Sequence, residues 1–71
     1  MTESVYKIIE LVGSSSESWE KAAQNAITKA SESLRELRIA EVISMYITIK
    51  DGKIESYRTK LKVSFKYEGH H

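Results

Sequence analysis

The sequence predicts an α+β fold in the order β-α-β-β, with a three-stranded antiparallel sheet packed on one helix. Two observations indicate this fold class. From residue 16 to residue 36, apolar residues recur at the spacing of one helical face. Before and after that stretch, residues 5–12, 39–49 and 54–67 are rich in β-branched and aromatic residues, as strands are. We therefore interpret residues 1–67 as a single domain.

The first expected strand ends at Gly13, and a serine-rich cluster follows it. Ser14 and Glu17 have the spacing of a capping box, in which each side chain accepts a hydrogen bond from a free backbone N–H at the helix start. Ser15 or Ser16 would also fit as the cap, so the sequence leaves the first helical residue open. The cluster has no glycine-rich phosphate-binding pattern, which favours a structural cap.

The predicted helix extends from about Ser16 to Glu36 and has one apolar and one charged face. The charged face is expected to be solvated. The apolar face is rich in alanine and consists of Trp19, Ala22, Ala23, Ala26, Ile27, Ala30, Leu34 and Leu37. A helix of this kind can lie close to one face of the sheet and leaves the other face uncovered.

The second and third strands are expected to form a hairpin around Asp51 and Gly52. Asp-Gly is favoured in a two-residue type I′ turn, because both central residues of that turn need a positive φ. The turn pairs Lys50 with Lys53 and thereby sets the register of the hairpin.

The predicted register divides the hairpin into two faces. The face toward the helix carries Tyr57, Thr59, Leu61, Val63, Phe65 and Tyr67, partnered by Tyr46, Ser44, Val42 and Ala40. The other face carries Arg58, Lys60, Lys62, Ser64 and Lys66, opposite Met45, Ile43, Glu41 and Ile39. Glu41 then lies opposite Lys62, a favourable charge pair. The second strand is apolar on both faces, and one helix can cover only one face of the sheet. Further copies of the chain are the simplest cover for the other face, so the sequence predicts an oligomer.

Composition limits the function classes that fit this chain. A chain of 71 residues buries a small core, and the absence of cysteine excludes disulfides and cysteine-rich zinc sites, so self-association is the expected source of further stability. The net charge of +1 gives no general attraction to nucleic acid, and we interpret the basic residues of the third strand as a solvated face. No apolar run is long enough to span a membrane, and no signal peptide is visible, so a cytoplasmic location is expected.

No catalytic constellation is visible in the sequence. We interpret residues 68–71 as the remnant of an expression tag, and the native chain then has no histidine for acid–base chemistry. The serines have no base to activate them, and the carboxylates are scattered along the chain. The chain is therefore predicted not to be an enzyme.

Several segments together resemble the dodecin family. The resemblance covers about residues 5–67 and rests on Val5-Tyr6-Lys7, Gly13-Ser14-Ser15, Ser18-Trp19, Ala22-Ala23, Leu37-Arg38-Ile39-Ala40-Glu41-Val42 and the third-strand segment from Tyr57 to Phe65. It implies a hollow dodecamer of cubic type, built from trimers, that binds and stores flavin without catalysis.

The resemblance also implies a ligand site. In flavin-binding dodecins a tryptophan before the second-strand Glu-Val stacks on the isoalloxazine ring, and a third-strand glutamine bonds its polar edge. These positions correspond here to Ile39 and Arg58, which share one face of the predicted sheet with Glu41 and Met45, and these four are the candidate cofactor-binding residues. Isoleucine does not stack as an indole does, and arginine donates hydrogen bonds but does not accept them, so riboflavin or FMN is expected to bind weakly.

A calcium-binding subgroup of the family is closer in two segments. It shares the Ser-Trp helix start and the Tyr-Arg-x-Lys-Leu-x-Val-Ser-Phe-Lys third strand, here Tyr57 to Lys66. This resemblance implies calcium at an assembly interface. Calcium takes about six to eight oxygen ligands, and no single loop here supplies them. Asp51, Glu55, Glu41 and backbone carbonyls could contribute only from several chains, so no metal ligand is assigned. A self-assembling module without a small ligand is the remaining alternative.

Overall fold

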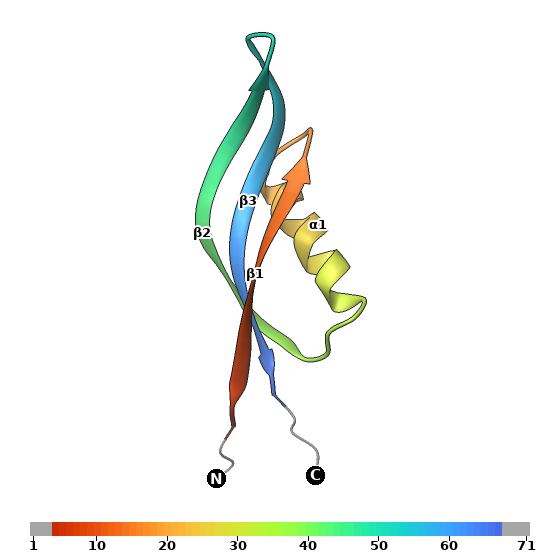
Figure 1. Cartoon of the computed structure of the whole chain (residues 1–71). Helices are drawn as coiled ribbons and strands as arrows, with labels where there is room; N and C mark the ends of the chain where they lie inside the picture. Colours follow the sequence, from red (N-terminus) through yellow and green to blue (C-terminus); the bar gives the residue numbers. More distant parts are fainter. Residues whose placement is uncertain (1–3, 68–71) are drawn as a thin grey trace.

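A computed structural model describes residues 4–67 of the chain. It contains β1 (Tyr6–Ser15), α1 (Trp19–Ser31), β2 (Leu37–Lys50) and β3 (Lys53–Lys66), as Figure 1 shows. The strands form one antiparallel sheet in the order β1-β3-β2. The predicted β-α-β-β fold is confirmed. The expected tag remnant, residues 68–71, lies outside the described residues.

The molecule is elongated. Its extents are 54 × 20 × 17 Å and its radius of gyration is 14.8 Å, against about 11 Å for a compact domain of this length. The long β2-β3 hairpin projects past α1, which lies beside the sheet (Figure 1). Much of the hairpin is therefore left without cover by the rest of the chain.

The sequence predicts that the first strand ends at Gly13, and this prediction is wrong. Strand β1 continues to Ser15, and Gly13 is paired with Thr59 of β3. A Cβ atom at position 13 would lie 1.9 Å from the backbone oxygen of Ala22 and 3.0 Å from the Cβ of Ala26. The glycine is thus required by the close approach of α1 to the strand.

The helix begins at a different cap from the three that the sequence left open. The hydroxyl of Ser18 accepts a hydrogen bond from the backbone N–H of Lys21 at 3.0 Å, which makes Ser18 the N-cap. Ser15 accepts from the backbone N–H of Glu17 at 2.9 Å and so orders the connection before the helix. The predicted capping box of Ser14 and Glu17 is wrong, because the longer β1 moves the helix start toward the C-terminus.

The helix is also shorter than predicted and ends at Ser31, with Glu32 as its C-cap. The backbone N–H of Leu34 still bonds the carbonyl of Ala30 at 2.9 Å, but Leu34 is already outside the helix. Glu36 has a φ of 58°, and this left-handed residue leads the chain into β2 at Leu37. Leu34 and Leu37 continue the apolar spacing of the helix in the sequence, and this spacing predicts a helix end beyond the observed one.

The hairpin turn has the predicted conformation. Asp51 has a φ of 52° and Gly52 a φ of 73°, and Lys50 pairs with Lys53. Glu41 lies opposite Lys62, as the turn-based register requires.

An irregularity in β2 shifts the register in the middle of the hairpin. The pairing slips by one residue between Val42 and Ser44 and returns after Thr48. The observed pairs in between are Ser44 with Lys60, Met45 with Thr59, Tyr46 with Arg58 and Ile47 with Tyr57. The predicted placement of Met45 opposite Arg58 is therefore wrong, because an extra residue in β2 moves Met45 to the opposite face of the sheet.

The core is small and lies between α1 and the strands β1 and β3. Its buried residues are Ala22, Ala26, Ala30, Leu61 and Val63, with Ile9, Leu11, Ala23, Ile27 and Leu37 packed around them. In contrast, Val42, Met45 and Ile39 of β2 are between 51% and 67% exposed. The predicted excess of uncovered apolar surface on β2 is confirmed.

Candidate functional site

The face of the sheet turned away from α1, here called the outer face, carries four of the basic residues of the chain. Side chains alternate between faces along a strand, and Thr59, Leu61 and Val63 of β3 are buried beneath the helix. The outer face therefore contains Arg58, Lys60, Lys62, Ser64 and Lys66 of β3, flanked by Ser14, Val12, Glu10, Ile8 and Tyr6 of β1. On the β2 side it contains Tyr46, Ser44, Glu41 and Ile39.

Ile39 and Glu41, two of the four candidate residues, lie together on the outer face. They line a shallow hollow of about 180 Å³ with Ile8, Lys62 and Ser64. Ile39 is 67% exposed. The hollow is open and mixed in character, with two isoleucines, one acid and one base, and it offers no aromatic surface.

Arg58 is distant from this hollow. It shares the outer face with Ile39, as predicted, but Ile39 pairs with Ser64, six positions further along β3. Six residues of a strand span about 20 Å. A single chain consequently does not bring Ile39 and Arg58 into one pocket, and a site that uses both residues needs two copies of the chain.

Met45 is separated from the other three candidates by the sheet itself. It pairs with Thr59, whose side chain lies on the helix side, and it is 56% exposed. Its side chain therefore lies on the helix side of the sheet, where the helix does not cover it, and not on the outer face.

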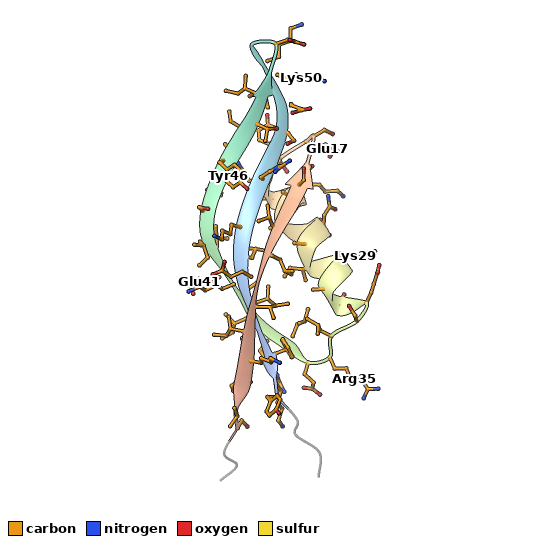
Figure 2. All side chains as sticks on the ribbon, viewed as in Figure 1. Glu17, Lys29, Arg35, Glu41, Tyr46 and Lys50 are labelled. Carbon is orange, nitrogen blue, oxygen red and sulfur yellow. The ribbon has the colours of Figure 1, made fainter. Side chains whose placement is uncertain are left out.

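The residue that the structure places beside Arg58 is Tyr46 (labelled in Figure 2), which the sequence analysis assigned to the opposite face. Its position depends on contacts to the start of α1. The indole Nε1 of Trp19 donates a hydrogen bond to the carbonyl oxygen of Tyr46 at 3.1 Å, and the hydroxyl of Thr59 donates to the carbonyl of Trp19 at 2.9 Å. The Trp19 ring also meets Tyr57 edge to face, with centroids 5.2 Å apart.

Charges on the outer face are only partly paired. The ammonium of Lys60 lies 3.4 Å from a carboxylate oxygen of Glu10. Lys62 lies between Glu10 and Glu41 across the two neighbouring strands. Arg58 is flanked by Ser14 and Tyr46, neither of which is charged, and the ion pairs found among residues 4–67 do not include it.

A second hollow of about 400 Å³ lies between α1 and β1, away from all four candidate residues. It is lined by Ile9, Leu11, Val12, Ala26, Lys29, Ala30, Ser33 and Leu34. The lining is mostly aliphatic, so this hollow has the character of a contact surface more than of a polar ligand site.

The described residues do not form a metal site within one chain. Across residues 4–67, no group of three or more acidic or histidine side chains is close enough to hold an ion. In the same range, no helix has the length and apolar character needed to cross a membrane.

The fold is a small β-α-β-β unit with its helix on one face of the sheet. Comparison with known proteins identifies the family. The dodecin family model matches residues 5–68, and the chain belongs to the dodecin family. It is 43% identical over 63 residues to calcium dodecin from Mycobacterium tuberculosis, a match that covers 89% of each chain.

Solved structures show the same similarity. The structure of dodecin from Streptomyces coelicolor superposes with a TM-score of 0.93 at 34% identity, over 99% of this chain and all of that one. The structure of the Mycobacterium tuberculosis calcium dodecin, a calcium chelating antigen with a novel calcium-binding site, gives a TM-score of 0.84 at 43% identity, over 96% of this chain and 97% of that one. The resemblance inferred from the sequence is confirmed.

Proposed function

We propose that this chain is the subunit of a non-enzymatic dodecamer, built from trimers, that binds a small ligand between its subunits. One observation carries the proposal: Ile39 and Arg58 share the outer face but lie about 20 Å apart along it. A pocket that uses both residues needs a second copy, whose antiparallel approach can bring its Arg58 to the Ile39 of the first.

The exposed surface of β2 supports assembly. Exposed apolar side chains occur on both faces of this strand, among them Ile39 at 67% and Met45 at 56% exposure. A core as small as this one supplies no more than about 3–5 kcal/mol in a chain of this size. Burial of β2 between copies would add apolar contact at about 25 cal/mol for each Å² removed from water.

A flavin is the ligand that the family resemblance implies, and the site chemistry supports only weak binding of it at Ile39. Isoleucine contributes apolar contact area but no aromatic ring face. An aromatic contact adds about 0.5–1.5 kcal/mol to the free energy gained from the buried area alone. Storage of such a ligand, and a cytoplasmic location, stay predictions from the sequence.

Calcium is the second candidate, favoured by the 43% identity to calcium dodecin. Calcium takes about six to eight oxygens, and no cluster among residues 4–67 supplies even three acidic groups. A calcium site in this protein would therefore combine carboxylates such as Glu41 with oxygens from other subunits.

Native mass spectrometry of the untreated protein tests the proposal, since it reports the number of subunits and any retained ligand together. We expect twelve subunits. Titration calorimetry with calcium chloride and with FMN then identifies the ligand class, with magnesium chloride as the control for unspecific cation binding. Twelve subunits that bind neither calcium nor FMN would favour the purely structural alternative.

A further inference from the structure

We infer that β2 of one copy packs on the hollow between α1 and β1 of the next copy. The part of β2 concerned, here called the helix-side strip, consists of Ala40, Val42, Met45 and Ile47. The contact joins two different surfaces, so it repeats from copy to copy around a ring. The inference rests on the assembly in the proposed function and assigns the surfaces that join copies within a trimer.

The irregularity in β2 makes the helix-side strip apolar. Its four residues pair with consecutive positions of β3 on the side that faces the helix. Without the extra residue between Val42 and Ser44, Ser44 and Tyr46 would take the places of Met45 and Ile47. Val42 and Met45 are both more than half exposed, and methionine adapts its shape to an irregular apolar surface. β2 therefore carries a continuous apolar row that its own helix does not cover.

The strip and the hollow lie at the same level on opposite edges of the sheet. Val42 of the strip and Leu11 of the hollow pair with the same residue of β3, Leu61. Because β3 separates the two edges, the strip does not reach the hollow of its own chain. A second copy placed beside the first, without a shift along the strands, brings a strip and a hollow together. Repetition of such a contact can close a ring, whereas a shift at each step would produce a helical filament.

The lining of the hollow matches the chemistry of the strip. Its volume is about 400 Å³, and six of the eight residues that line it are aliphatic: Ile9, Leu11, Val12, Ala26, Ala30 and Leu34. The strip is aliphatic apart from the thioether of Met45. Contact between the two would remove apolar surface of both copies from water, which is the main driving force of association.

The charges at the borders of the two surfaces are complementary. Lys29 is the only charged residue in the lining of the hollow, and Glu41 is the only charged residue in segment 39–49 of β2. The two lie on opposite sides of the molecule, as Figure 2 shows. The ion pairs found among residues 4–67 do not include Glu41. The side-by-side contact brings Glu41 of one copy toward Lys29 of the next, and such complementarity fixes the orientation of the two copies.

The ring contact and the proposed ligand site use opposite faces of the sheet. The strip lies on the helix side, whereas Ile39 and Arg58 lie on the outer face. A trimer that is held together through the strips therefore keeps its outer faces available. Those faces can meet the outer faces of other trimers, as a site that combines Ile39 with a second copy's Arg58 requires.

Thiol crosslinking tests the contact, because the chain contains no cysteine of its own. Val42→Cys places a thiol on the strip, and Val12→Cys places one in the lining of the hollow at a residue that is half-exposed. The assembled double variant is treated with a short bismaleimide and separated on a denaturing gel. We expect covalent dimers and trimers and nothing larger, and each single variant should stay monomeric.

The matched control combines Val42→Cys with Ile8→Cys. Ile8 is exposed and lies on the same strand as Val12, but it belongs to the outer-face hollow that Ile39 lines, so this pair should give much less crosslinked product. Dimers from Val42→Cys alone would show that two strips meet about a two-fold axis and would overturn the inference. Products of the Val12→Cys/Val42→Cys variant that stop at the dimer, or that extend beyond the trimer, would also overturn it.

Native mass spectrometry of the same samples separates this inference from the proposed function. Twelve subunits without crosslinks between Val12→Cys and Val42→Cys would keep the proposed assembly and overturn the ring contact. A monomer in the unmodified protein would overturn both.

Charge exchange provides a second measurement in case a cysteine variant fails to assemble. Glu41→Lys and Lys29→Glu should each raise the dissociation constant of the assembly by roughly 1.4- to 5-fold per contact, and the two changes together should recover much of that loss. Lys21→Glu is the control, since Lys21 is exposed on the same helix but is not part of the hollow. Equal recovery of Glu41→Lys by Lys21→Glu, or no recovery by Lys29→Glu, would contradict the contact.

Discussion

The helix-covered side of the sheet and the strand β2 differ in what their apolar side chains contact. Under α1, Leu61 and Val63 are at most 1% exposed and pack against alanines of the helix. On β2, the cross-strand neighbour of Leu61 is Val42, which is 51% exposed. Two apolar residues that face each other in one hairpin thus have opposite environments. The difference indicates that the first region stabilises the folded chain, and it leaves the second as the surface available to the proposed assembly.

Truncation of Leu61 and of Val42 tests that difference with the largest expected effect. Leu61→Ala should lower the free energy of unfolding by about 2–5 kcal/mol, because it opens a cavity in the core. Val42→Ala should change the stability of the isolated subunit by well under about 1 kcal/mol and should act on assembly instead. Chemical denaturation at two protein concentrations separates the effects, since only an assembly term depends on concentration. Equal losses from both variants at low concentration would contradict the comparison.

Gly13 provides the next test, which concerns the packing of α1 against β1. Gly13→Ala places a Cβ atom against the Ala22 carbonyl and should cost about 1–3 kcal/mol through overpacking. Gly52→Ala is the matched control: nothing lies within 4 Å of its Cβ, and only its φ of 73° opposes the change. Thermal unfolding should show the larger loss for Gly13→Ala, together with weaker packing of α1 in circular dichroism.

Reversal of the charge at Glu41 addresses the exposed region. Glu41→Lys places like charges on cross-strand neighbours, because Lys62 lies opposite. The expected cost is about 0.2–1 kcal/mol. Glu41→Gln removes the charge without reversing it, and its stability should lie between that of Glu41→Lys and that of the unmodified protein. Size-exclusion chromatography and the thermal midpoint follow the change, and an unaltered midpoint and size in Glu41→Lys would show that this pairing contributes nothing.

The cap of α1 provides the most local test. Ser18→Ala should destabilise the subunit by about 0.5–2 kcal/mol, because the backbone N–H of Lys21 loses its acceptor. Ser16→Ala, which removes one of the caps that the sequence left open, should change the stability by less than about 0.5 kcal/mol. A larger loss from Ser16→Ala than from Ser18→Ala in urea denaturation would place the helix start elsewhere.

Features set by neighbouring residues were predictable from the sequence. The Asp51-Gly52 turn fixed the end of the hairpin, and from it followed the pairing of Glu41 with Lys62 and the shared face of Ile39 and Arg58. The turn prediction holds because turn chemistry is a local property. The pairing of Glu41 with Lys62 holds because the two register shifts, between Thr48 and Ile49 and between Val42 and Ser44, cancel along the hairpin.

Features set by distant residues were not predictable. Gly13 looked like a strand end, but its role follows from the approach of Ala22 on the helix. The irregularity after Val42 has no signal in the local sequence, and the hydrogen bond to the carbonyl oxygen of Tyr46 comes from Trp19, 27 residues earlier in the chain. For this reason the observed site differs from the predicted one: Met45 lies on the helix side of the sheet, and Tyr46 lies beside Arg58 on the outer face.

Sedimentation velocity of the unmodified protein at micromolar concentration tests most directly the claim that copies of the chain cover β2. We expect a single species with the mass of twelve subunits, which Met45→Lys would dissociate or shift to smaller species, because it buries a charge in the contact. A stable monomer at that concentration, with β2 as exposed in solution as in the single chain, would contradict the claim.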